Sequence, residues 1–136
     1  MNRICPESKG VYQCELNLKD GSLSAATLSG ATSSPSFIAF HPNQKYLNAV
    51  NEGEAKVSNR EPYYSIAIFS IDAETRELKA IGHQGMVVKT PRRFAIEPTG
   101  KYMLVANQSG GNVMVFRDNQ STGEIEHAET NATVTS

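Results

Sequence analysis

The sequence has few of the residues that mark metal-binding, secreted or nucleic-acid-binding proteins. It has no tryptophan, two cysteines and three histidines among 136 residues, and its formal net charge is −1. Nucleic acids and anionic membranes attract basic patches, so this near balance of charge predicts neither as a partner. Cys5 and Cys14 lack the spacing of a metal site, and we expect two free thiols in a reducing compartment.

Long apolar runs are also missing. No stretch approaches the roughly 20 apolar residues that cross a bilayer, and the first ten residues, MNRICPESKG, contain no apolar segment typical of a secretory signal. The sequence therefore predicts no membrane partner and a cytoplasmic location. Its length of 136 residues suits a single domain.

A repeated hairpin organises the residues that are present. Residues 35–52, PSFIAFHPNQKYLNAVNE, align with residues 91–108, PRRFAIEPTGKYMLVANQ, over 18 positions without a gap. Both copies place apolar, β-branched and aromatic residues on either side of a proline-containing turn. Six aligned pairs are identical: Pro35/Pro91, Ala39/Ala95, Pro42/Pro98, Lys45/Lys101, Tyr46/Tyr102 and Asn51/Asn107. Such self-similarity is typical of repeat architectures.

A further segment occurs three times, as GVYQCELNLKDGSL, SIAIFSIDAETREL and NVMVFRDNQSTGEI. Each copy has an apolar strand before a polar turn. With the strands of one unit labelled A to D, the chain reads C-D, A-B-C-D, A-B-C-D. We predict no helix and an all-β fold of four-stranded antiparallel blades, about two and a half blades of a β-propeller with roughly 40–50 residues per blade. A plain antiparallel sandwich is the alternative.

The repeat sets the expected boundaries within a single domain, 1–136. They are a half blade at 10–28 with strands at 11–18 and 23–28, a linker at 29–34, a blade at 35–81 that contains a polar insert at 53–64, a linker at 82–90, a blade at 91–128 and a tail at 129–136. The run from Met103 to Ala106 is apolar without interruption, which predicts a strand covered on both faces.

Two strings in this sequence, PRRFAIEPTGKY and AVNE, carry a family resemblance. The chain resembles the seven-bladed propeller lactonases, the 6-phosphogluconolactonase family that includes fungal muconate-lactonising enzymes. Residues 8–52 resemble the N-terminal region of that family, and the stretch from Pro91 resembles its C-terminal blade. The resemblance implies hydrolysis of 6-phosphogluconolactone to 6-phosphogluconate in the pentose phosphate pathway, with a sugar lactone as the small-molecule partner and no cofactor.

The chain also departs from that family. A family member has about seven blades, whereas this chain has residues for about two and a half, and residues 82–90 join an early blade to a late one. Where the family often has Pro-Arg-His, this chain has Pro91, Arg92 and Arg93. It therefore resembles a truncated or internally deleted relative. Three hypotheses stay open: a lactonase of doubtful activity, a non-catalytic fragment that binds a partner or self-associates through exposed blade faces, and a gene-model or deletion product.

Antiparallel pairing of strands A and B predicts where chemistry could occur. It places the residue that enters A beside the residue that leaves B, which are Arg92 beside Gln108 and Ser36 beside Glu52. Strand A lines the channel of a propeller, so we expect these residues on the rim of the channel mouth. By resemblance, this rim binds and hydrolyses the lactone.

The residue types suit lactone hydrolysis. A carboxylate can take a proton from the attacking water, and a guanidinium can bind a phosphate or the developing oxyanion. We predict Glu52 and Arg92 as catalytic residues, and Arg92, Gln108 and Arg93 as substrate-binding residues. An arginine or glutamate at a strand end is also common as a solvated surface residue. The three histidines lack ligand spacing, so no metal site is expected.

Overall fold

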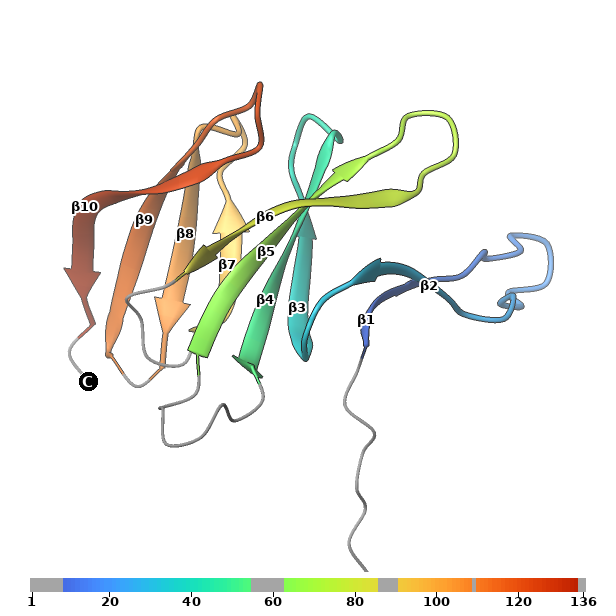
Figure 1. Cartoon of the computed structure of the whole chain (residues 1–136), viewed down its shortest axis with the longest axis horizontal. Helices are drawn as coiled ribbons and strands as arrows, with labels where there is room; N and C mark the ends of the chain where they lie inside the picture. The colour runs from blue at the N-terminus through green and yellow to red at the C-terminus, as the bar shows by residue number, and fades with distance from the viewer. Residues whose placement is uncertain (1–8, 55–62, 86–90, 109, 135–136) are drawn as a thin grey trace, which may run out of the picture.

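The computed structural model describes residues 9–54, 63–85, 91–108 and 110–134. Within these ranges the chain forms β-strands and no helix (Figure 1). The strands are β1 (Gly10–Gln13), β2 (Thr27–Ala31), β3 (Pro35–Phe40), β4 (Tyr46–Glu54), β5 (Tyr63–Ile71), β6 (Leu78–Gly85), β7 (Pro91–Ile96), β8 (Tyr102–Asn107), β9 (Asn112–Asp118) and β10 (Ile125–Thr133). The predicted all-β class is confirmed.

The strands form three antiparallel sheets in chain order. β1 pairs with β2, β3 to β6 form a four-stranded sheet, and β7 to β10 form another. Figure 1 shows the first four-stranded sheet standing between the second and the β1–β2 pair, as neighbouring blades do in a propeller. We call these sheets the half blade, the first blade and the second blade. Each blade has a front face toward the preceding strands of the chain and a back face on the other side.

The two aligned hairpins turn in the same way. In the first, the backbone N–H of Gln44 donates to the carbonyl of His41 at 2.8 Å, and in the second Gly100 donates to Glu97 at 2.8 Å. Gln44 and Gly100, which are aligned in the repeat, both have positive φ angles, 60° and 76°. The repeat therefore reproduces a backbone conformation even where the residue types differ.

The main core lies between the two blades. Its buried members are Val50, Ile66, Ile68, Phe94, Met103, Val105, Met114, Phe116 and Ile125. The back face of the first blade supplies Val50, Ile66 and Ile68, and the second blade supplies the other six residues. At its centre the rings of Phe37 and Phe94 meet edge to face, with centroids 5.3 Å apart. A smaller core joins the half blade to the front face of the first blade through Val11, Leu47 and Phe69.

Several predicted boundaries are wrong at the ends of outer strands. The strand predicted at 11–18 pairs only to Gln13, and its partner is Thr27–Ala31 rather than 23–28. Farther along this hairpin only an isolated bridge joins Leu16 to Leu23. The expected linker at 29–34 therefore begins inside β2. The register of this hairpin places Val11 in the smaller core. The turn residues alone do not indicate this contact.

Strands also extend into three other segments that were predicted as connections. Gly82–Gly85 continues β6 opposite Ser65–Ile68, and the expected tail from 129 pairs with β9 as far as Thr133. Both ends of the insert at 53–64 are strand, with Glu54 opposite Tyr63, and its middle, 55–62, lies outside the described residues. These stretches are mostly polar, and backbone pairing to a neighbouring strand does not require an apolar pattern.

The prediction that β8 is covered on both faces is wrong. Met103 and Val105 are fully buried against the first blade, whereas Leu104 is 39% exposed on the back face. Within the described chain, no sheet packs on that face of the second blade. The apolar run therefore gives this face a surface suited to packing against a neighbouring blade.

Candidate functional site

The candidate rim lies at one edge of both blades. Figure 1 shows that β3 and β7 begin, and β4 and β8 end, at the same edge. Pro35 lies opposite Asn51, and Pro91 lies opposite Asn107. In both copies the register shifts at the next residue, Ser36 or Arg92, which is therefore bulged out of the ladder. Bulges redirect side chains and are common next to active sites.

Arg92 and Gln108 meet at this rim. The Nε–H of Arg92 donates a hydrogen bond to Oε1 of Gln108, and both residues are exposed. Among the described residues, no carboxylate lies within ion-pair distance of Arg92. The guanidinium is thus oriented by an amide, and its remaining N–H donors suit it to bind a phosphate or carboxylate group.

The structure does not place the other two predicted site residues, Glu52 and Arg93, against this pair among the side chains that it describes. Glu52 follows Asn51 in β4, at the same edge, but its side chain lies outside the described part of the structure. Arg93 is exposed, lies opposite Ala106 and precedes the buried Phe94. Because side chains alternate along a strand, Arg93 lies on the back face of the second blade, away from the first blade. The roles of both residues stay predictions.

Two buried asparagines fix the backbone of the rim. Asn51 donates from Nδ2 to Ser65 Oγ at 3.2 Å and to Thr32 Oγ1 at 2.8 Å. Its repeat partner Asn107 donates from Nδ2 to Asn112 Oδ1 at 2.8 Å. In both blades the amide ties the end of strand B to the start of strand C. The sequence showed the identity of Asn51 and Asn107, but their buried contacts needed the structure.

The opposite edge contains a contact that sequence reasoning missed. His41 is buried, and its Nδ1 accepts a hydrogen bond from the backbone N–H of Asn43 at 3.1 Å. The ring proton is therefore assigned to Nε2, which donates to the carbonyl of Gly100 at 2.9 Å. Tyr46 donates its hydroxyl to the carbonyl of Ser121 at 2.8 Å. We call these contacts between the turns of the two blades the interblade latch.

Asp118 completes the latch. Its Oδ2 lies 3.6 Å from His41 Nε2, and its Oδ1 is buried without a hydrogen-bond partner among the described residues. Burial raises the pKa of Asp118, and the nearby His41 opposes the rise. In the second blade Glu97 takes the place of His41. There, hydrogen bonds from the Thr99 hydroxyl and from backbone N–H groups lower the pKa of Glu97 to about 2.

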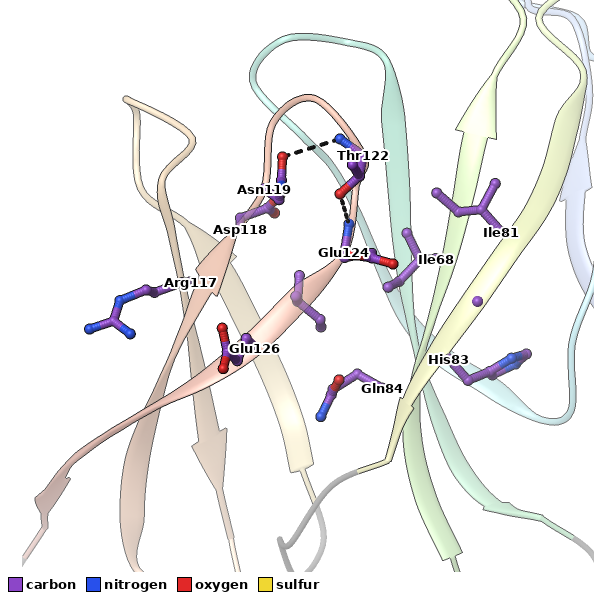
Figure 2. A pocket seen from close by; sticks show the side chains of 12 residues that line it. Ile68, Ile81, His83, Gln84, Arg117, Asp118, Asn119, Thr122, Glu124 and Glu126 are labelled. Carbon is purple, nitrogen blue, oxygen red and sulfur yellow. Dashed lines mark hydrogen bonds between the residues drawn. The ribbon is translucent and has the colours of Figure 1, made fainter.

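A cleft of about 640 Å³ lies between the outer strands of the two blades (Figure 2). β6 supplies His83 and Gln84, which were predicted in a linker. β9, the turn after it and β10 supply Arg117, Glu124 and Glu126 in that order. Figure 2 shows Gln84 directed toward the second blade, whereas Arg117 extends away from the cleft. Among the described residues, no hydrogen bond joins His83 to a carboxylate of this cleft.

Among the described residues, no group of three or more His, Cys, Asp or Glu side chains could hold a metal ion. No described helix is long and apolar enough to span a membrane.

Comparison with known proteins identifies the family of this chain. The family described as "Lactonase, 7-bladed beta-propeller" matches residues 3–60 and 55–136. A 6-phosphogluconolactonase from Formosa agariphila is 40% identical over 89 residues, which are 65% of this chain and 23% of that protein. One from Bacillus subtilis is 25% identical over 109 residues, which are 80% of this chain and 29% of that protein. The chain thus spans less than a third of these relatives.

Solved structures agree with the fold. A crystal structure of a candidate 6-phosphogluconolactonase from Bacteroides fragilis superimposes with a TM-score of 0.71 at 27% identity, covering 93% of this chain and 34% of that chain. A similar protein from Bacteroides uniformis gives a TM-score of 0.69 at 28% identity, covering 90% of this chain and 34% of that chain.

The alignment to a third relative indicates missing internal residues. A 6-phosphogluconolactonase from Erwinia tasmaniensis aligns over 142 positions that include only 74% of this 136-residue chain. About 40 aligned positions therefore have no residue of this chain opposite them, which is close to the length of one propeller blade.

Proposed function

The chain belongs to the lactonase family with a seven-bladed β-propeller fold, and from this we propose that its rim binds a phosphorylated sugar lactone, 6-phosphogluconolactone. The single observation that carries the proposal is the exposed Arg92–Gln108 pair on a strand bulge. The guanidinium binds the phosphate or the ester oxygen, and the amide holds the guanidinium in place. A cytoplasmic location and a place in the pentose phosphate pathway remain predictions.

Hydrolysis at this rim would follow ordinary ester chemistry. A water molecule adds to the lactone carbonyl, and Glu52 accepts its proton. The oxyanion that forms is stabilised by a positive group, for which Arg92 is the candidate. The ring C–O bond then breaks, the departing ring oxygen takes the proton back from Glu52, and the open-chain acid is released. Only two blades of the described chain contribute to the rim, so we propose turnover far below that of a full-length relative.

Ligand binding tests the role of Arg92. We expect the Arg92→Ala variant to bind 6-phosphogluconate, the stable reaction product, at least about tenfold more weakly, because a hydrogen bond to a charged group contributes about 1.5–3 kcal/mol. Isothermal titration calorimetry measures the affinity. Arg117→Ala is the matched control, because this exposed arginine lies opposite Tyr102, at the other end of β8 from the rim. Equal losses in both variants would contradict a specific role for Arg92.

A second candidate function is self-association, and the back face of the second blade favours it. Ala95, Leu104 and Ala106 occupy positions aligned with Ala39, Asn48 and Val50 of the first blade. Val50 is fully buried under the second blade, whereas Leu104 and Ala106 are exposed. A blade face suited to packing is thus uncovered, and exposed apolar faces promote association.

Sedimentation tests this second function. We expect the purified chain to sediment as dimers or larger species whose fraction rises with concentration. Leu104→Glu, which places a charge at the centre of the uncovered face, should shift the distribution toward monomer, whereas Leu18→Glu, at an exposed loop position, should not. A parent chain that is monomeric at every concentration would refute self-association and leave the rim proposal intact.

A further inference from the structure

The half blade covers only part of the first blade. By the repeat, β1 and β2 are strands C and D, and they contact the front face of the first blade through Val11. Beside β1 lies a mostly apolar cleft of about 390 Å³, which we call the open trough. Its lining includes Val11, Tyr12, Ile38, Phe40, Leu47 and Leu78.

In the second blade, a complete neighbouring blade covers the surface that corresponds to the open trough. Ile38 and Phe40 of the open trough align with Phe94 and Ile96. Ile38 is 42% and Phe40 is 63% exposed, whereas Phe94 is 5% exposed. The β3–β4 hairpin covers Phe94, with Phe37 stacked edge to face on its ring. The surface of the second blade that corresponds to the open trough is thus covered by an A–B hairpin, β3–β4.

The pairing of β1 supports the same occupant. In the first blade strand C, β5, pairs with β4 on one side and β6 on the other. In the half blade strand C is β1, and the ladder described for Val11, Tyr12 and Gln13 joins them to β2 on one side. A hairpin seated in the open trough would add its second strand antiparallel to β1, as β4 adds to β5. Strand addition combined with apolar side-chain pockets is a common mode of peptide recognition.

The chain's own hairpins do not match the open trough at its turn end. In the second blade, Tyr46 packs where Gly123 leaves space, since a Cβ there would lie 2.7 Å from the ring. His41 likewise packs on Gly100. The first blade has Arg76 aligned with Gly123 and Gln44 aligned with Gly100. Both A–B hairpins of this chain carry a tyrosine, Tyr46 or Tyr102, at the position that would face Arg76 in the open trough.

We propose that the open trough binds a β-hairpin of the A–B type supplied in trans by a different polypeptide. The hairpin pairs with β1, covers Ile38 and Phe40 with an apolar face, and places an acidic side chain opposite Arg76. Among the described residues that line the open trough, Arg76 is the one with a charged side chain. A carboxylate there forms a charge-assisted hydrogen bond that a tyrosine ring does not.

Backbone-cyclised hairpins serve as probes, because cyclisation removes much of the ordering cost of an isolated hairpin. The test probe has the sequence of residues 35–51 with Tyr46→Glu, and the comparison probe keeps Tyr46. We expect the test probe to bind the full chain, to protect the amides of Tyr12 and Gln13 from hydrogen exchange, and to bind at least about tenfold more tightly than the comparison probe, which corresponds to about 1.4 kcal/mol.

Variants of the chain locate the binding. Phe40→Ser should weaken binding of the test probe at least about tenfold, whereas Leu18→Ser, at an exposed loop position outside the lining of the open trough, should leave it unchanged. Arg76→Gly should reverse the preference toward the probe that keeps Tyr46. Failure of both probes to bind, or binding unaffected by Phe40→Ser, overturns the proposal. Tighter binding of the unmodified hairpin by the parent chain would instead assign the open trough to a second copy.

Discussion

Replacement of Phe94 with alanine should lower the free energy of unfolding by about 3–5 kcal/mol. Phe94 is 5% exposed and belongs to the core between the two blades. The substitution removes a ring that packs edge to face on Phe37 and leaves a cavity that two rigid sheets cannot close. Urea denaturation followed by circular dichroism measures the change, because the chain has no tryptophan for fluorescence.

The repeat supplies a matched control for Phe94. Ile38 occupies the aligned position in the first blade but is 42% exposed. Ile38→Ala should lower the free energy of unfolding by less than about 1 kcal/mol, since little apolar surface returns to water. Similar losses in the two variants would show that the two front faces are covered equally, contrary to the structure.

Replacement of His41 with alanine should lower the free energy of unfolding by about 2–4 kcal/mol. The substitution leaves a cavity at the interblade latch and removes the hydrogen bond from Nε2 to the carbonyl of Gly100. His83→Ala, an exposed histidine on β6, should change the free energy of unfolding by less than about 0.5 kcal/mol. Urea denaturation of both variants distinguishes a buried contact from a general effect of histidine loss.

The pH dependence of the latch follows from Asp118. Its pKa is raised in the folded state, mainly by burial, so the folded protein holds this proton to higher pH than the unfolded chain does. Its contribution to stability is therefore complete below the ordinary aspartate pKa and decreases as the pH rises through the raised pKa. Asp118→Asn should remove this decrease, so its stability relative to the parent should increase with pH. A constant difference across the pH range would contradict the assignment.

Local sequence patterns predicted the hairpins well because each hairpin is specified by its own turn and apolar residues. The predicted strand at the apolar run Met103–Ala106 lies within β8, Tyr102–Asn107, and the Arg92–Gln108 contact followed from antiparallel pairing alone. The ends of β6 and β10 were missed, since backbone pairing to an existing strand needs no apolar side chains.

Contacts between blades were not predictable in the same way. His41 precedes a proline in a turn, and nothing in its neighbours indicates that it reaches Gly100, 59 residues away. Exposure of Leu104 depends on which sheets are present, so an apolar run alone gives the wrong answer. For the candidate site, the sequence placed Arg92 beside Gln108, but it could not show that the Phe94 face packs on the first blade and that Arg93 therefore lies on the face away from it.

The two blades share backbone pairing but differ in the side chains of their turns. One carries His41 and Tyr46 toward glycines of its neighbour, and the other carries Glu97, which bonds within its own turn. Copying one unit of such an array would thus produce sheets that fold alike yet do not stack. Recombination that removes or rearranges units must preserve matching residues on each side of the new joint, which limits how these genes can shorten.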